Sequence, residues 1–263
     1  MLKKRLNTSY LINWIGGKRL LRSRISGLIP VNIATYIEPF GGGAWVLFYK
    51  DKWADLEIYN DLNDKLVNLF RCVKYHSDEL VKEFRWMIAS RKMFKETLES
   101  NTYTDIQKAA KFLYLVSRSF GGAQRHFGTG KRAGGAMKSH QNIMARIMAI
   151  CLRLDRVVIE NLDFEELITR YDYEDAFFYC DPPYTSGVGY EVTSTKDFEH
   201  ERLRDCLKNI KGRFLLYYDD SPKVRELYKD FEMIEVSRQK GINNKCPNGK
   251  EYKELLIANY KIT

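Results

Sequence analysis

The residues best suited to chemistry are Asp181-Pro182-Pro183-Tyr184, which directly follow the apolar run 176–180. In an open α/β sheet, ligands bind beyond the carboxyl ends of the strands, where this tetrapeptide is expected. The prolines restrict the backbone, so the Asp181 carboxylate and the Pro182 carbonyl can converge on one ligand. Two such acceptors suit the exocyclic amine of adenine, because they bind its hydrogens and leave the nitrogen lone pair directed outward, while Tyr184 offers a flat surface for the base. An Asp-capped turn stiffened by two prolines is the alternative.

A second candidate is the glycine-rich segment 38–44, Glu-Pro-Phe-Gly-Gly-Gly-Ala, which follows an expected strand at 35–37. Glycines at a strand-to-helix turn allow a ligand to approach the main chain and leave helix N-terminal amides free. The dinucleotide pattern G-x-G-x-x-G is not met, because Val46 occupies the third glycine position. About twenty residues further on, Asp61 ends the next expected strand, where an acid can accept both hydroxyls of a ribose. A helix N-cap at Asp61 or Asn63 is the alternative.

Positive charge is concentrated in two segments of a chain with a formal net charge of +9. Residues 1–30 hold seven basic residues and no acid, and residues 118–156 hold eight basic residues and one acid. Clustered positive charge is the pattern expected for contact with a phosphate backbone, whose counterions are released on binding. A soluble basic surface without a partner is the alternative.

The five cysteines and four histidines predict neither a disulfide framework nor a metal site. The cysteines are scattered without a C-x-x-C pair, and the histidines show no ligand spacing. No apolar run approaches the length of a membrane span, and polar residues interrupt the stretch behind the basic start of the chain. We therefore expect a protein of the reducing cytoplasm, with no export signal, no membrane segment and no metal.

Apolar runs and helical patterns alternate at both ends of the chain, which predicts an α/β sheet. The runs indicate strands at 35–37, 56–59, 157–159, 176–180, 214–218 and 255–258. A helix is expected over 44–50, and Phe198, Leu203, Leu207 and Ile210 mark another.

Between residues 63 and 154 every periodic segment is helical. Leu80, Phe84 and Ile88 recur at intervals of four, and Thr104 with Gln107 forms a capping box for a helix that reaches Phe120 and ends at Gly121-Gly122. A glycine-rich basic loop spans 121–137, before a helix marked by apolar residues from 143 to 154. Glycine, arginine and an aromatic residue together favour approach to nucleic acid, and a solvated loop without function is the alternative.

The order of these motifs resembles the Dam-type adenine-specific DNA methyltransferases. Those enzymes open with W-x-G-G-K, matched here by residues 14–18. They continue with E-P-F-x-G-G-G-A, to which residues 38–44 correspond, and with N-D-x-N, matched by residues 60–63. A helical insertion follows, then DPPY, and then a strand with a downstream acid and proline, matched by 217–222. The resemblance covers nearly the whole chain, although the insertion matches only in size, helicity and charge.

The resemblance implies a Rossmann-like S-adenosylmethionine-dependent methyltransferase sheet with an inserted, mostly helical target-recognition domain. The catalytic domain would comprise 1–62 and 156–263, and the insertion 63–155. The implied reaction is site-specific transfer of a methyl group from S-adenosylmethionine to adenine N6 in double-stranded DNA, with the base flipped out of the helix and a companion restriction endonuclease as a candidate partner. An RNA adenine methyltransferase and a non-catalytic nucleic-acid-binding protein on the same fold remain alternatives. A dinucleotide oxidoreductase is disfavoured by Val46.

The resemblance also implies roles for individual residues. The target adenine would be held by Asp181, Pro182, Pro183 and Tyr184. The cofactor would contact Trp14, Lys18, Phe40, Gly41, Gly43, Asp61, Asp163, Phe164 and Asp181. Core packing for Trp14 and a surface charge for Lys18 are the alternatives. From the charge pattern, we expect DNA to be contacted by Arg118, Arg125, Lys131, Arg132 and Lys138.

Overall fold

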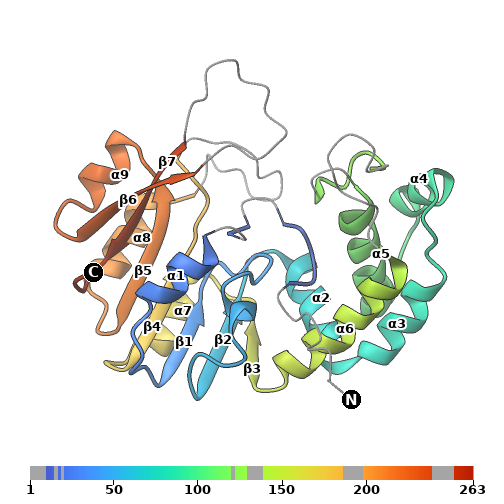
Figure 1. The fold of residues 1–263 in the computed structure, drawn as a ribbon, viewed down its shortest axis with the longest axis horizontal. Coiled ribbons are helices and arrows are strands. Elements are labelled where there is room, and N and C mark those ends of the chain that lie inside the picture. Colours follow the sequence, from blue (N-terminus) through green and yellow to red (C-terminus); the bar gives the residue numbers. More distant parts are fainter. Residues whose placement is uncertain are drawn as a thin grey trace. The chain divides into compact units, whose positions relative to one another are not determined.

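The chain folds into two compact units (Figure 1). The computed structural model describes residues 10–14, 17–18, 21–119, 122–128, 139–185, 198–238 and 252–262. Unit 1 comprises Met1–Ser23, Gly42–Asp51 and Asp61–Asn161. Unit 2 comprises Arg24–Gly41, Lys52–Asn60 and Leu162–Thr263.

A seven-stranded, mainly parallel sheet has the strand order β3-β2-β1-β4-β5-β7-β6 (Figure 1). The strands are β1 (Thr35–Glu38), β2 (Leu56–Asn60), β3 (Val157–Glu160), β4 (Ala176–Cys180), β5 (Arg213–Asp219), β6 (Glu232–Arg238) and β7 (Tyr252–Ala258). β1 pairs in parallel with β2 and β4, and β4 pairs in parallel with β5. β7 is antiparallel to both β5 and β6. Every residue of β1 and β4 is buried, as expected for central parallel strands, and the predicted α/β sheet is confirmed.

Four short helices accompany the sheet: α1 (Arg22–Leu28), α7 (Phe164–Tyr171), α8 (His200–Lys208) and α9 (Pro222–Leu227). The Asp163 side chain caps α7 by accepting from the amide of Glu165, and Ser221 caps α9 by accepting from the amide of Val224. His200, Leu203 and Leu207 are the buried residues of α8, which confirms a helix at this place. Phe198 and Ile210, the other two residues of the expected pattern, lie outside it.

The predicted run of helices in the middle of the chain is confirmed in the residues described for unit 1. The helices are α2 (Asp64–Tyr75), α3 (Ser77–Arg85), α4 (Arg91–Glu99), α5 (Asp105–Arg118) and α6 (His140–Leu154). α5 packs against α2, α3 and α4, and α6 packs against α2 and α3 (Figure 1). The capping box of Thr104 and Gln107 is present at the start of α5. None of the helices in the described parts of the chain is long and apolar enough to cross a bilayer.

Several predicted boundaries are wrong. In place of a helix over 44–50 there is one 3-10 turn, Leu47–Tyr49. Neither end of the predicted range is helical, because Ala44 has a φ of 53° and Lys50 has an extended backbone. α3 ends at Arg85, which leaves Ile88 61% exposed.

The remaining differences concern α5 and β6. α5 ends at Arg118 and not at the glycines, while Phe120 and Gly121 lie outside the described residues. Strand β6 was not predicted, because charged and polar residues interrupt its apolar ones at the edge of the sheet. Among the β6 side chains whose burial is described, only Val236 is buried.

Candidate active site

The Asp-Pro-Pro-Tyr segment begins at the carboxyl end of β4. Strand β4 lies between β1 and β5, and all three are parallel, so their carboxyl ends share one edge of the sheet. Pro182 is buried, whereas Asp181, Pro183 and Tyr184 are partly exposed. The sheet therefore presents these polar groups at the edge where α/β sheets bind ligands, as expected from the sequence.

Hydrogen bonds from two neighbouring strands hold the end of this segment. The Tyr184 hydroxyl donates to Glu254 Oε1 of β7 at 2.8 Å. The Thr185 amide and hydroxyl donate to Asp219 Oδ1 and Oδ2 of β5, at 2.9 and 2.5 Å. Burial raises the pKa of Tyr184, and the charges of Asp181 and Glu254 raise it further. The phenol is therefore a neutral donor at physiological pH.

Acidic side chains and phenols surround the segment within unit 2. Burial raises the pKa of Tyr179 well above its ordinary value, and the negative charges of Asp181 and Glu38 act in the same direction. Glu38 is 2% exposed and accepts a hydrogen bond from the Tyr36 hydroxyl at 2.7 Å. Acceptors of this kind suit an amine or a cationic group and would repel a phosphate. The described residues contain no group of three or more side chains arranged to bind a metal ion.

Three phenylalanine rings form a cluster in unit 2, joined by an arginine. Phe40, Phe164 and Phe198 have ring centroids 5.6 to 5.7 Å apart. The Arg202 guanidinium lies 4.4 Å over the Phe164 ring, and its Nη2 donates to Asp163 Oδ2 at 2.6 Å. Arg202 thus contacts both members of the Asp163-Phe164 pair, which sequence analysis assigned to the cofactor.

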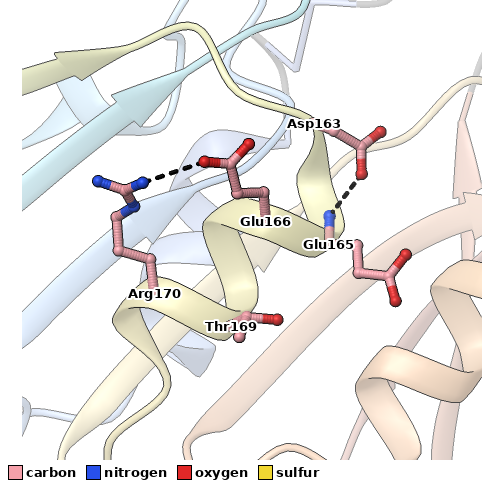
Figure 2. Close-up of a pocket in the computed structure, with 5 residues that line it drawn as sticks. All are labelled: Asp163, Glu165, Glu166, Thr169 and Arg170. Carbon is pink, nitrogen blue, oxygen red and sulfur yellow. Dashed lines mark hydrogen bonds and ion pairs between the residues drawn. The ribbon is translucent and has the colours of Figure 1, made fainter.

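A surface hollow lies along α7, lined by Asp163, Glu165, Glu166, Thr169 and Arg170. Figure 2 shows that Arg170 pairs with Glu166 and that the Asp163 carboxylate accepts from the amide of Glu165. Three carboxylates outnumber the one guanidinium, so the hollow repels anions. It shares only Asp163 with the expected site residues.

In unit 1, Asp61 joins the glycine-rich loop to the start of α2. Its Oδ2 accepts from the Gly42 amide and its Oδ1 from the Asn63 amide, each at 2.8 Å. The N-cap of α2 is Asn63, whose side chain accepts from the amide of Lys65. Burial raises the pKa of Asp61 to about 6, and the two hydrogen bonds oppose that rise. Each carboxylate oxygen keeps a second lone pair with which it could accept a ribose hydroxyl.

Tryptophan side chains lie against the glycine-rich loop in unit 1. A Cβ added to Gly43 would come within 3.0 Å of both Trp14 Cβ and Trp45 Nε1. A side chain at this position would therefore crowd both tryptophans, which favours glycine whether or not a ligand is bound. Trp45 Nε1 is buried and has no acceptor among the described residues, which leaves a donor for a polar group.

The other residues expected to contact the cofactor also have defined surroundings. Lys18 is 3% exposed, which excludes the alternative of a surface charge. In unit 2, a Cβ on Gly41 would lie 2.3 Å from Tyr59 Cε2, so this position too requires glycine.

Only part of the expected DNA-contacting set is described. Arg118 is 2% exposed in the last turn of α5, and burial lowers its pKa. Arg125 is exposed, and Phe127, two residues further on, anchors the loop through a ring contact with Phe94, whose centroid lies 5.8 Å away. The Arg91 guanidinium lies 5.5 Å over Phe127. Lys131, Arg132 and Lys138 lie outside the described residues.

Sequence reasoning did not assign roles to Asp219, Glu254 or Arg202. A signal was present for the acids, because Glu254 directly precedes the apolar run 255–258 and Asp219 ends the run 214–218. A charged residue inside a buried strand is costly unless it is hydrogen-bonded, so such a residue has a partner. Nothing in the local pattern of Arg202 distinguishes it from a solvated helix residue.

Comparison with known proteins identifies the class of enzyme. The model of the D12 class N6 adenine-specific DNA methyltransferases matches residues 14–242. The type II methyltransferase M1.LlaDCHI of Lactococcus lactis subsp. cremoris is 25% identical over 98% of each chain. The type II methyltransferase M.CviBI of Paramecium bursaria Chlorella virus NC1A is 26% identical over 95% of this chain and 99% of its own. A DNA adenine methylase of Haemophilus influenzae is 25% identical over 97% of this chain and 95% of its own.

The sheet with Asp-Pro-Pro-Tyr at the end of β4 is thus that of an α/β methyltransferase. This chain belongs to the D12 class N6 adenine-specific DNA methyltransferases. The resemblance found in the sequence and the predicted site-specific methylation of adenine in DNA are confirmed.

Proposed function

We propose that this enzyme takes its methyl group from S-adenosylmethionine and transfers it to an adenine that has been flipped out of double-stranded DNA. The observation that carries the proposal is the attachment of the Asp-Pro-Pro-Tyr segment, which leaves β4 and is held by Glu254 and Asp219 from two other strands. A segment held in this way is preorganised, as the binding of one base in one orientation requires.

The Asp181 carboxylate and the Pro182 carbonyl are proposed to accept the two hydrogens of the adenine amine. They keep the nitrogen lone pair out of the ring and directed at the methyl donor. The neutral Tyr184 ring would stack on the base, a contact worth about 1–3 kcal/mol. That contact offsets part of the few kcal/mol that unpairing and unstacking cost.

S-adenosylmethionine would supply a methyl group that its sulfonium already activates, so the protein needs only to orient it and to place charge. In unit 1, Asp61 would accept the ribose hydroxyls, and Trp14, Lys18 and Gly43 would line the site. The unsatisfied Trp45 Nε1 and the remaining acceptor capacity of Asp61 fit a polar ligand of this kind.

In unit 2, the proposed cofactor contacts are the Asp163 carboxylate, the Phe164 and Phe40 rings, Gly41 and Asp181. A flat ring can pack on a cluster of phenylalanines, and a carboxylate can accept from an amino group at its edge. The contacts of Asp163 and Phe164 with Arg202 support their role as a pair.

The proposed DNA surface is the basic loop with Arg125, Lys131 and Arg132, together with Lys138 directly after it. The helical insertion 63–155, between the catalytic segments 1–62 and 156–263, carries this surface. Arg118 is left out, since a guanidinium that is 2% exposed does not reach a phosphate.

We also propose a companion restriction endonuclease, because two similar proteins are named type II methyltransferases. The free cysteines Cys72, Cys151, Cys180 and Cys206 support a place in the reducing cytoplasm.

Incubation with radiolabelled S-adenosylmethionine tests the donor and the acceptor together. Double-stranded DNA, RNA and protein are offered separately, and labelled nucleosides are separated after digestion. We expect label in N6-methyladenine from DNA. Label in RNA alone would contradict the proposed acceptor, and no label in any arm, with a competent fold, would contradict the donor. DNA with 2-aminopurine at the target position tests flipping, since its fluorescence rises when the base leaves the stack.

A further inference from the structure

We propose that Glu254 of β7 is a positioning residue for methyl transfer, which fixes the orientation of the Tyr184 ring. This inference rests on the proposed function, because it takes Tyr184 to be the surface that receives the target adenine. Glu254 itself would not touch the base, and it would act through the phenol of Tyr184.

Glu254 is a buried hydrogen-bond acceptor, and each of its two side-chain oxygens has a donor. Its side chain is 3% exposed, yet both of its oxygens are used. Oε1 accepts from the Tyr184 hydroxyl at 2.8 Å, and Oε2 accepts from the hydroxyl of Tyr217, a fully buried residue of β5. A buried carboxylate is tolerated only with such partners, and one of the two comes from the Asp-Pro-Pro-Tyr segment itself.

A second buried acid stands directly opposite Glu254. Asp219 of β5 is its partner in the strand register and is 9% exposed. Like charges directly opposite each other in a sheet destabilise the pair. Asp219 accepts two hydrogen bonds from Thr185, and Glu254 accepts one from Tyr184. Two acids that would otherwise repel each other thus hold Tyr184 and Thr185, which are consecutive in the chain. We infer from this that the pair of acids serves to position these residues, because on stability alone two opposed buried acids would be unfavourable.

The two acids constrain different parts of the segment. Asp219 accepts from the amide and the hydroxyl of Thr185, and it therefore acts on the chain that follows Tyr184 and not on the Tyr184 ring itself. Glu254 instead accepts from the hydroxyl at the far end of the ring. The ring centroid lies 6.5 Å from that of Tyr218, with the two planes tilted by 33°. The hydrogen bond to Glu254 thereby holds the ring in one orientation, as stacking on a base would require.

A double-mutant cycle tests the inference. Tyr184→Phe removes the donor and keeps the ring, and Glu254→Leu removes the acceptor. We expect each to lower kcat roughly tenfold, the size expected for one hydrogen bond to a charged group, with KM for DNA little changed. The double variant should be no slower than either single variant, because both changes break the same bond. Glu254→Gln, which keeps an acceptor oxygen, should recover most of the rate.

A matched control separates positioning from stability. Glu57 of β2 is 4% exposed and accepts from the amide of Trp53 at 3.0 Å, so Glu57→Leu also removes a buried, hydrogen-bonded glutamate. It should lower the melting temperature as Glu254→Leu does, without the loss of kcat. Multiplicative losses in the double variant, or an unchanged kcat in Glu254→Leu, would overturn the inference. The proposed function would fail separately, if the folded wild-type enzyme transferred no label from S-adenosylmethionine to DNA.

Discussion

In unit 2, Tyr184 and Thr185 are joined to side chains of neighbouring strands, whereas in unit 1 the Asp61 side chain is joined to main-chain amides of two loops. Glu254 and Asp219 hold Tyr184 and Thr185 over separations of 70 and 34 residues. Asp61 instead binds main-chain amides 19 and 2 residues away.

The difference indicates that the two units prepare for ligands in different ways. Unit 2 holds its site rigidly before any ligand arrives, because the strands that supply the acids are themselves fixed in the sheet. In unit 1, each oxygen of the buried Asp61 carboxylate accepts from one main-chain amide, so the carboxylate can accept further hydrogen bonds from a ligand. Changes around the Asp-Pro-Pro-Tyr segment should therefore affect the rate, and changes at Asp61 and the basic loop of unit 1 should affect affinity.

The largest expected effect is that of Asp181→Ala. Without this acceptor the amine loses its orientation, and we expect the single-turnover rate of methyl transfer to fall by about 10²–10³ or more, as for other preorganised groups at a reacting centre. DNA affinity, measured by fluorescence anisotropy, should change little because phosphate contacts dominate it. A variant that methylates at near the wild-type rate would show that Asp181 has no catalytic role. It would also contradict the expectation that the Asp-Pro-Pro-Tyr segment sets the rate.

The basic loop of unit 1 should affect affinity alone. Replacing Arg125, Lys131 and Arg132 with Ala should reduce the salt slope of DNA binding by up to about 0.9 for each lost phosphate contact. Replacing Lys52, Lys208 and Lys229 with Ala removes the same charge from unit 2 and is the control. Equal slopes for the two triple variants would show that the loop makes no specific phosphate contact.

Asp61→Asn should weaken cofactor affinity by about tenfold, because an amide cannot accept through both of its polar atoms as the carboxylate does. Isothermal titration calorimetry with S-adenosylmethionine gives the affinity, and circular dichroism checks the fold. Unchanged affinity in a folded variant would show that Asp61 does not bind the cofactor. Its role would then be purely structural, as a link between Gly42 and the start of α2.

The same variant gives a pH prediction. Burial raises the pKa of Asp61 from 3.8 to about 6, so the folded state binds this proton more tightly than the unfolded chain. The contribution of Asp61 to the free energy of unfolding thus increases as pH falls through 6 towards 4, and this contribution is lost as pH rises through 6. The free energy of unfolding of the wild type, minus that of Asp61→Asn, should increase as pH is lowered from 7 to 5 in urea titrations. A difference that stays constant over this range would contradict the raised pKa.

The smallest effect is expected for Arg202→Met, which keeps much of the side-chain volume over Phe164 and removes the charge. The Arg202 side chain is 35% exposed, and pairs this accessible contribute about 0–1 kcal/mol. We therefore expect KM for S-adenosylmethionine to rise by at most about fivefold, with kcat unchanged. Arg204→Met, on the same helix and paired with Asp205, is the control. A fall in kcat instead would mean that this part of unit 2 also sets the rate.

The sequence by itself determined the strands that matter most and the segment that follows them. β4 and the Asp-Pro-Pro-Tyr segment were predictable because a fully buried strand reads as an unbroken apolar run and prolines restrict the chain that leaves it. The start of α5 was predictable because a capping box is a local arrangement of Thr104 and Gln107. Each of these features depends on residues only a few positions apart.

Only the tertiary structure decided which polar groups meet. The bond between Tyr184 and Glu254 requires β5 and β7 to pair in one register, and a shift by one residue would turn Glu254 to the other face of the sheet. The burial of Arg118 depends on the packing of α5 against its neighbouring helices, and a charge count along the chain cannot distinguish it from the exposed Arg125. Positions along a strand or helix are local properties, but contacts and burial are set by elements far away in the sequence, and only the folded chain brings those elements together.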